Sequence, residues 1–276
     1  MPMNHVDDSD YLRDQQYRDS SNLNARAELH RRFSTNSRGW MPWVWDQLHI
    51  PHGGRALELG AGPGWLWHNH RDRVDPSWRI TLSDFSSGMV AELLANLAGA
   101  PFQVDARVID IQQIPFADDE FDAVIANHML YHVPDKARAL QEVGRVLAPN
   151  GHFYAATNGR EHLRQIDEIV LTVYPTAREI IEKTVSHRDF LLETGGDLLR
   201  EHFEQVEMRP YEDSLRVTEV EPLIAYILSG LAGTENLTAE AVEPLRDEIR
   251  RRLAADGVIE IGKASGLFVC SGPKGR

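Results

Sequence analysis

The sequence predicts an α/β fold with a doubly wound, mostly parallel sheet. The first observation is the stretch 56–64, ALELGAGPG, in which a short apolar run is followed by three glycines. Such a run is typical of a buried parallel strand, and glycines after it let a ligand approach the backbone closely because no Cβ intervenes. The second observation is the alternation of strand-like and helix-like segments over residues 51–159. This alternation is the pattern of a sheet with helices on both faces.

Composition narrows the classes of function. The chain has 276 residues, enough for one large domain or two small ones with a substantial core. Its net charge of −13 argues against nucleic acid as a partner, because phosphate binding needs a basic face. The single cysteine, Cys270, excludes an intrachain disulfide and a cysteine-cluster metal site. No spacing of histidines and carboxylates resembles a metal site either, so we expect no metal.

Insertion into a membrane is not expected. The most apolar window, residues 222–233, is far shorter than the roughly 18 residues that a membrane-spanning helix needs. The first residues, MPMNHVDDSD, are polar and acidic, which is not typical of a signal peptide. We therefore expect a cytoplasmic protein. Its oligomeric state is left open, with a homodimer as one arrangement.

Residues 1–50 are expected to form a helical arm in front of an α/β domain at residues 51–276. Asn22 can cap a helix in which Leu23, Ala27, His30 and Phe33 recur at helical spacing. The tryptophans at positions 40, 43 and 45 mark a second short helix that we expect to lie mostly in the core. The apolar stripe of the first helix must be covered. Permanent packing on an outer helix and closure over a ligand at the sheet edge both satisfy that need.

The spacing of the glycines indicates which ligand the turn accepts. Counted from Gly60, the sixth position of a dinucleotide fingerprint is Trp65, where that fingerprint requires glycine or alanine. The Lys-Ser/Thr ending of a triphosphate-binding loop is missing as well. The pattern E-x-G-x-G-x-G instead resembles motif I of the class I S-adenosylmethionine (SAM)-dependent methyltransferases. The resemblance implies that SAM binds at Glu58, Gly60, Ala61, Gly62 and Gly64.

The next strand, residues 79–84, ends in an acid where an α/β fold binds a ribose. Asp84 follows Gly64 by 20 residues, and Ser86 can cap a helix over residues 87–97. The segment DFSSGM resembles the D-x-S-x-x-M segment of the ubiquinone-biosynthesis-type methyltransferases. By this resemblance Asp84 holds both ribose hydroxyls and Met89 packs on the adenine, with Phe85 as a further contact.

Two more strands complete the expected cofactor site. Residues 106–111 form the third strand, and the resemblance implies that Asp110, beside Ile111, accepts a hydrogen bond from the adenine amino group. The order P-F-x-D-x-x-F-D at residues 115–122 resembles a signature of the same family and leads into the fourth strand, 121–127. Asn127 and His128 then lie at the carboxyl end of that strand, beside the centre of methyl transfer.

The remainder of the sheet follows the same pattern. Pro134 is expected at the first position of a helix whose buried face carries Leu140 and Val143. The segment LAPNGHFYAAT resembles the L-x-P-G-G turn and fifth strand of the family, and Asn150 replaces the first glycine because it also tolerates positive φ. The run GLFVC near the end is expected to be the antiparallel strand that closes such sheets. The resemblance thus implies a seven-stranded, Rossmann-like methyltransferase fold.

Other segments fall outside the motifs. Helices are expected at residues 160–186, 187–203, 218–231 and 237–255, and a strand at 206–217. The insertions near 160–186 and 218–256, together with the arm, are expected to build the substrate pocket. The run Arg250–Arg252 is expected to face solvent and not to bind an anion.

The function implied by the resemblance is transfer of a methyl group from SAM to an oxygen, nitrogen or carbon of a small molecule, as in secondary metabolism. In-line attack on the methyl group depends mainly on proximity and orientation, so no catalytic residue is assigned. A general base is needed only if the acceptor must lose a proton. His128, Tyr131 and His132 lie near the centre by sequence, and we expect a structural role for His132 because the family pattern contains it whatever atom is methylated.

Several alternatives stay open at this point. A SAM-fold enzyme could couple binding to other chemistry such as cyclisation, or the chain could bind SAM without catalysis. An RNA or protein methyltransferase is disfavoured by the acidic charge and by the absence of an N-P-P-Y segment after the fourth strand. Methyltransferases of this type resemble one another in using N-terminal helices as a lid. By that resemblance the arm at 11–36 closes over SAM, with Tyr17 and Arg26 as contacts to the cofactor.

Overall fold

The chain forms two compact units. The computed structural model describes residues 21–179, 181–182, 189–230 and 239–275. One unit, here called the α/β unit, consists of the described parts of residues 40–159, 189–211 and 265–275. The other, here called the helical unit, consists of the described parts of residues 21–39, 160–182 and 212–264. The predicted arm, residues 1–50, therefore contributes to both units.

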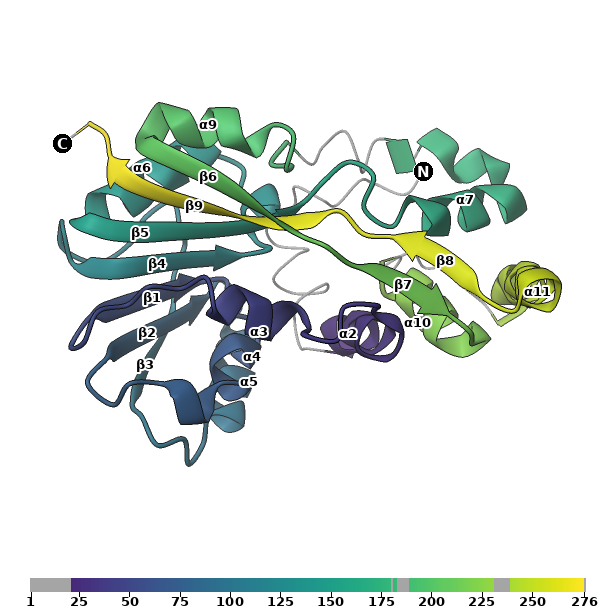
Figure 1. The fold of residues 1–276 in the computed structure, drawn as a ribbon, viewed down its shortest axis with the longest axis horizontal. Coiled ribbons are helices and arrows are strands. Elements are labelled where there is room, and N and C mark those ends of the chain that lie inside the picture. The colour runs from purple at the N-terminus through teal and green to yellow at the C-terminus, as the bar shows by residue number, and fades with distance from the viewer. Residues whose placement is uncertain (1–20, 180, 183–188, 231–238, 276) are drawn as a thin grey trace. The chain divides into compact units, whose positions relative to one another are not determined.

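The α/β unit is built on a seven-stranded sheet with the order β3-β2-β1-β4-β5-β9-β6 (Figure 1). Strands β1 to β5 run parallel, and β9 runs antiparallel to both β5 and β6. The prediction of a doubly wound, mostly parallel sheet closed by an antiparallel strand is confirmed. The strands are β1 (Arg55–Leu59), β2 (Arg79–Asp84), β3 (Val104–Val108), β4 (Phe121–Asn127), β5 (Leu147–Asn158), β6 (Phe203–Tyr211) and β9 (Ser265–Pro273).

Two apolar cores lie against this sheet. Along β1, Leu57 and Leu59 join one cluster and Ala56 joins the other, because successive side chains of a strand point to opposite faces. The predicted apolar face of α6, including Leu140 and Val143, is fully buried in the first cluster. The helices of this unit are α3 (Trp40–Trp45), α4 (Trp65–His68), α5 (Ser87–Asn96), α6 (Lys136–Val146) and α9 (Gly195–His202), with short 3-10 turns at Arg71–Arg73 and Leu130–His132.

Two boundaries beside the predicted site differ from expectation. Strand β3 occupies residues 104–108, and not 106–111, because its register with β2 ends where Val108 pairs with Asp84. The apolar residues Ile109 and Ile111 that suggested a longer strand are buried in the core from the following loop. Helix α6 begins at Lys136 because Asp135 caps it, its carboxylate accepting from the Arg138 N–H at 2.9 Å. Pro134 precedes that cap.

Three boundaries in the second half of the chain also differ. The expected helix at 187–203 is present only over residues 195–202. Before it, the Phe190 carbonyl and the Leu192 N–H bond to β5, which holds that backbone outside a helix. The expected strand at 206–217 is two strands in different sheets, β6 and β7, and β5 begins at residue 147 with an irregularity in its pairing with β4. Positions 187 and 188 lie outside the described residues.

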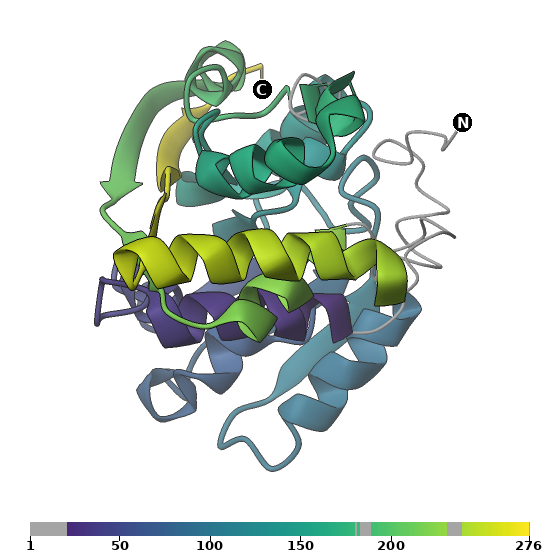
Figure 2. The ribbon, with the colours of Figure 1, turned by 90° about the vertical axis from the view of Figure 1, so that its right-hand side faces the viewer.

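The helical unit packs four helices around a two-stranded ribbon. Its elements are α2 (Ser21–Phe33), α7 (Arg164–Val173), the 3-10 turn Pro175–Ala177, β7 (Ser214–Val217), α10 (Val220–Gly230), α11 (Ala239–Asp256) and β8 (Ile259–Gly262). Figure 2 shows α11 as the long yellow-green helix. The apolar stripe of α2 is buried in this unit, where Leu29 and Phe33 share a cluster with Ile224 of α10. Leu29 and Phe33 are thus covered within the helical unit, whereas Leu23, Ala27 and His30 of the predicted stripe are half-buried.

The charged residues of α11 behave as expected. Arg250 pairs with Glu243 and Asp247, and Arg251 pairs with Glu248. Arg250 and Arg251 thus lie on the solvated face of α11 as expected, whereas Arg252 is partly buried and also pairs with Glu248. Within the described part of the chain, no helix is both long and apolar enough to cross a membrane.

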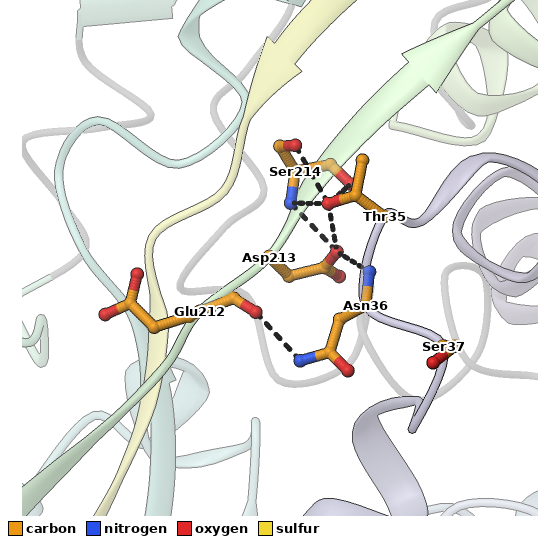
Figure 3. Close-up of a pocket in the computed structure, with 6 residues that line it drawn as sticks. All are labelled: Thr35, Asn36, Ser37, Glu212, Asp213 and Ser214. Atoms are coloured by element: carbon orange, nitrogen blue, oxygen red, sulfur yellow. Dashed lines mark hydrogen bonds between the residues drawn. The ribbon is translucent and has the colours of Figure 1, made fainter.

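The helical unit also contains a buried ion pair that the sequence did not predict. The Asp213 side chain is 0% exposed and pairs with Lys263, which is 7% exposed. The Asp213 carboxylate also accepts from the Ser34 hydroxyl. It accepts as well from the Thr35 hydroxyl and the Asn36 N–H (Figure 3). Burial alone would raise the pKa of Asp213, but the bonds from Lys263, Ser34 and Asn36 lower it below its ordinary value. We call these five residues the Asp213 hub.

The hub borders an open polar hollow of the helical unit. Its lining residues are Thr35, Asn36, Ser37, Glu212, Asp213 and Ser214 (Figure 3). None of the predicted cofactor-binding residues belongs to this hollow. The donors around Asp213 already occupy its carboxylate, so this acid is not open to a ligand.

Candidate cofactor site

The glycine-rich turn leaves the carboxyl end of β1. Gly60, Gly62 and Gly64 have φ of 68°, 53° and 76°, in the left-handed region that favours glycine. A Cβ on Gly60 would lie 2.8 Å from the side chain of Met129, so the loop after β4 presses directly on this turn. The Ala61 N–H donates to the Ser83 carbonyl of β2 at 2.8 Å. The turn is therefore fixed between the ends of three neighbouring strands, β2, β1 and β4.

Asp84 ties the end of β2 to the same turn. One carboxylate oxygen accepts from the Gly62 N–H at 2.9 Å, and the other accepts from the Ser86 N–H at 2.9 Å. Burial raises the pKa of Asp84 above its ordinary value, and the N–H groups of Ser86, Gly62 and Phe85 oppose that rise. Because a carboxylate offers about four acceptor positions, each oxygen can still accept a further hydrogen bond.

Glu58 differs from Asp84 in its surroundings. Its side chain is 2% exposed, and Trp67 Nε1 of α4 donates to its carboxylate at 2.6 Å. Burial raises the pKa of Glu58 to about 7, the Trp67 bond opposes the rise, and the charge of Asp84 adds to it. The Glu58 carboxyl group thus points into the protein core, toward Trp67.

The contacts around α5 follow the expected order. The Ser86 hydroxyl caps α5 by accepting from the Met89 N–H at 3.4 Å, as predicted. Phe85 is 40% exposed, whereas Met89 is 1% exposed. Of the two side chains predicted to meet an adenine, only Phe85 offers an open surface in this structure. Helix α4 is a single turn, so its dipole is small.

Asp110 lies in the loop after β3. Its carboxylate accepts from the Gln112 N–H at 2.9 Å and from the Gln112 side-chain amide at 3.1 Å. The neighbouring Ile111 is buried in the core. Both residues follow the strand that lies next to β2, so they share the sheet edge that carries Asp84.

Asn127 and His128 end β4 on the other side of the turn. The Asn127 amide oxygen accepts from Trp40 Nε1 at 3.3 Å, and its amide nitrogen lies 3.9 Å from the Met41 sulfur. Asn127 therefore anchors α3 at the carboxyl end of β4. His128 has φ of 58°, an uncommon value for a residue with a side chain, and its N–H donates to the Ala156 carbonyl of β5 at 3.2 Å.

Sequence reasoning missed the aromatic cluster beside His128. The Trp40 ring lies 4.8 Å from the His128 ring, 5.3 Å from Trp43 and 5.2 Å from Tyr211, between ring centroids. The tryptophans were expected as core, and Trp45 is buried as such, but Trp40 and Trp43 are only half-buried. The one signal in the sequence was the presence of three tryptophans within six residues. That signal does not reveal that Trp40 bonds to Asn127, 87 residues later.

The two predicted lid residues are Tyr17 and Arg26. Tyr17 lies outside the described residues. Arg26 belongs to the helical unit, where its guanidinium donates to the Ser229 hydroxyl at 3.1 Å and to the Ser229 carbonyl at 2.9 Å. His132 ends the short turn after β4, and its ring lies 4.5 Å from that of Tyr131. Among the described residues, no cluster of His, Cys, Asp and Glu side chains is placed to hold a metal ion.

The chain is similar to known methyltransferases. Residues 57–155 match a family model described as a methyltransferase domain. Over 115 residues the chain is 36% identical to the ubiquinone/menaquinone biosynthesis C-methyltransferase of Desulfotalea psychrophila, which covers 41% of this chain and 44% of that one. The Geobacter sulfurreducens protein of the same name is 36% identical over 116 residues, covering 41% and 45%. The chain thus matches less than half the length of these curated relatives.

Solved structures share the fold. Phosphoethanolamine N-methyltransferase 2 of Haemonchus contortus, solved in complex with S-adenosyl-L-methionine, superposes with a TM-score of 0.60 at 18% identity. The match covers 96% of this chain and 60% of that one. Residues 57–155 contain the glycine-rich turn, Asp84 and the strand ends described above. This part of the chain is therefore similar to a methyltransferase domain.

Proposed function

We propose that the chain is an enzyme that transfers a methyl group from SAM to a small-molecule acceptor. The observation that carries the proposal is Asp84, whose two oxygens accept backbone N–H groups and have acceptor positions left for two hydroxyls. Two adjacent hydroxyls on a ribose match that arrangement. A carboxyl group accepts hydrogen bonds most strongly when it is ionised. The backbone N–H groups of Ser86, Gly62 and Phe85 favour the ionised form of Asp84.

The order of the strands supports one direction for the cofactor along the sheet edge. Asp110 follows β3, Asp84 ends β2, the glycines follow β1, and Asn127 ends β4, and these strands are neighbours in that order. An adenine near Asp110 and Phe85 and a ribose at Asp84 would leave the methionine part over the glycine-rich turn. Ligands bind in α/β sheets where the strand order reverses, here between β1 and β4.

The acceptor would then approach from the end of β4. When bound, SAM supplies an electrophilic methyl group, and the protein must orient the acceptor in line with it and exclude water. Trp40 and His128 are the side chains that this chain offers there. A role for His128 as proton acceptor applies only to acceptors that must lose a proton.

The relatives support a small organic acceptor. Those described above are named as C-methyltransferases of ubiquinone and menaquinone biosynthesis, which favours carbon as the methylated atom. The helical unit lies wholly outside residues 57–155, the region that the family model matches. We propose that its insertions at 160–186 and 218–256 help to select the acceptor, so that selection depends on residues outside the matched region. The cytoplasmic location and the closure of residues 11–36 over SAM stay predictions.

Calorimetry with SAM, S-adenosylhomocysteine and NAD tests the proposal. We expect the first two to bind and NAD not to bind, because Trp65 stands where a dinucleotide fold needs a small residue. At a hundredfold excess over the dissociation constant, S-adenosylhomocysteine should stabilise the fold by about 2.7 kcal/mol. Binding of NAD without binding of SAM would overturn the assignment. Incubation with SAM and pools of small aromatic and quinone-like compounds, read out as released S-adenosylhomocysteine, then identifies the acceptor.

A further inference from the structure

The carboxyl group of Glu58 faces the protein and not the open edge of the sheet. Its side chain is 2% exposed, and it lies 2.6 Å from Trp67 Nε1, which belongs to a side chain that is 0% exposed. Ala56, two residues earlier on the same face of β1, is buried in the cluster that also contains Trp67. A ligand lying over the glycine-rich turn would therefore meet the backbone of this strand end before it met the Glu58 carboxyl group.

The Glu58–Trp67 bond closes the glycine-rich turn. Glu58 comes two residues before Gly60, and Trp67 comes three residues after Gly64, so the bond joins the two ends of the turn. Trp67 is itself held in place, because its N–H donates to the Gly64 carbonyl at 3.2 Å. Its ring also lies edge-on to Trp45 with centroids 5.6 Å apart.

We propose that Glu58 and Trp67 are a positioning pair that holds the glycine-rich turn in the conformation that binds cofactor, without Glu58 contacting the cofactor. This inference rests on the proposed function of the turn. Under this proposal, two hydrogen bonds of different kinds hold the turn. Asp84 holds the Gly62 N–H and remains open to a ligand, whereas Glu58 holds α4 from the buried side.

The chemistry of the pair indicates what it requires. An indole N–H is a donor only, so Trp67 needs an oxygen acceptor at this position and does not need a negative charge. Burial raises the pKa of Glu58 to about 7, so near neutral pH the group exists in both ionised and neutral forms. Both forms present a carboxyl oxygen to the indole. Glutamine presents one as well, and alanine does not.

The experiment measures S-adenosylhomocysteine affinity by calorimetry at pH 7.5, well below the melting temperature of each variant. Glu58→Gln should stay within about threefold of the parent, because it retains the acceptor. Glu58→Ala and Trp67→Phe should each weaken binding about tenfold, because either change removes the one hydrogen bond between these side chains that orders the turn. The double variant Glu58→Ala/Trp67→Phe should bind no more weakly than the weaker single variant, because both changes remove the same interaction.

Trp78→Phe is the matched control. Trp78 packs against the same core cluster, so this variant removes an indole N–H from that cluster without touching the bond to Glu58, and its affinity should match the parent. Loss of affinity in Glu58→Gln equal to that in Glu58→Ala, with Trp67→Phe unchanged, would show a direct ionic contact and overturn the inference. If Glu58→Ala does not fold, the other two variants still decide the question. A positioning pair predicts normal affinity in Glu58→Gln and weakened affinity in Trp67→Phe, and a direct ionic contact predicts the reverse. Failure of the parent to bind S-adenosylhomocysteine would instead reject the proposed function.

Discussion

At the scale of single residues, Asp84 has the largest expected effect on cofactor binding. Asp84→Ala removes the acceptor for the Gly62 N–H and the acceptors proposed for two ribose hydroxyls. Hydrogen bonds to a charged group contribute about 1.5–3 kcal/mol each, so S-adenosylhomocysteine affinity should fall at least about a hundredfold. Calorimetry on folded protein measures this change.

The control for Asp84 is an acid on the neighbouring strand. Asp105 of β3 is half-exposed and pairs with Arg107 on the surface. Asp105→Ala should leave the affinity unchanged, because such pairs contribute little. Equal affinities in Asp84→Ala and the parent would mean that the ribose site lies elsewhere.

Glu58 gives a prediction about stability and pH. The pKa of this carboxyl is raised by burial from 4.5 to about 7, so the folded protein holds the proton more tightly than the unfolded chain does. As pH rises from about 4.5 to about 7, the unfolded chain ionises this group while the folded protein keeps it protonated, so the free energy of unfolding falls by as much as about 3 kcal/mol. Below pH 4.5 the penalty is absent, and above pH 7 it is complete.

Urea denaturation of the parent and Glu58→Gln at several pH values isolates that contribution. Glutamine does not titrate, so the variant should gain stability relative to the parent as pH rises through this window. The measured quantity is the change with pH in the stability difference between the two proteins. Any constant cost of burying the glutamine amide does not affect that change. A stability difference that is flat between pH 5 and pH 8 would contradict the raised pKa.

Residue spacing predicted some partners and not others. Asp84 and Ser86 were predictable because their contacts are local or follow from the known geometry of a strand-turn-helix unit. The partner of Asn127 was not, because Trp40 lies 87 residues away and nothing in either segment encodes the other. The sequence could also show that Glu58 lies near the turn but not that its carboxyl group faces inward to Trp67, although Trp67 follows nine residues later.

At the scale of elements, the glycine-rich turn depends on its left-handed backbone. Gly64 has φ of 76°, and a Cβ there would lie 3.1 Å from the Leu93 side chain of α5. Gly64→Ala should therefore lower the free energy of unfolding by about 1–3 kcal/mol and weaken S-adenosylhomocysteine binding. Thermal denaturation and calorimetry measure the two effects.

Gly99 provides the matched control for that backbone strain. Its φ is 73°, and no atom lies within 4 Å of where a Cβ would be. Gly99→Ala should carry the same backbone strain without the contact to Leu93 and without a change in affinity. If the two variants lose equal stability and both keep full affinity, the packing of Gly64 on α5 has no role in the turn.

Element positions were predicted where one local pattern decided them. Strands β2 and β4 have the expected bounds, because each is an apolar run with an acid or amide at its end. The expected strand at 206–217 was wrong because the two acids Glu212 and Asp213 separate two strands, and the chain passes there from the seven-stranded sheet to the ribbon. The contacts of Asp213 with Ser34 and Lys263 accompany this passage between sheets. The spacing of apolar residues does not predict contacts with such distant segments.

At the scale of the whole molecule, the Asp213 hub is expected to hold the helical unit together. Asp213→Asn removes the charge that balances Lys263, which is 7% exposed. Breaking a buried ion pair by changing one partner costs about 3–5 kcal/mol, because the remaining charge stays buried. Hydrogen exchange should show faster exchange in β7 and β8 and unchanged protection in β1 and β2.

The control for the hub is the preceding residue. Glu212 is exposed and lines the same hollow, so Glu212→Gln should leave exchange in β7 and β8 unchanged. Equal protection of the ribbon in Asp213→Asn and in the parent would show that the apolar cluster alone maintains this unit.

The hub also determines when the helical unit can form during synthesis of the chain. Asp213 is 179 residues from Ser34 and 50 residues from Lys263, and the cluster that buries Leu29 likewise draws on residues up to Ile261. On a ribosome, α2 would emerge early and would have no core to join until the ribbon was made. Until then its apolar stripe would be open to solvent, to chaperones and to other nascent chains. Closing such long loops is slow, so we expect the helical unit to be the last part of the newborn protein to fold.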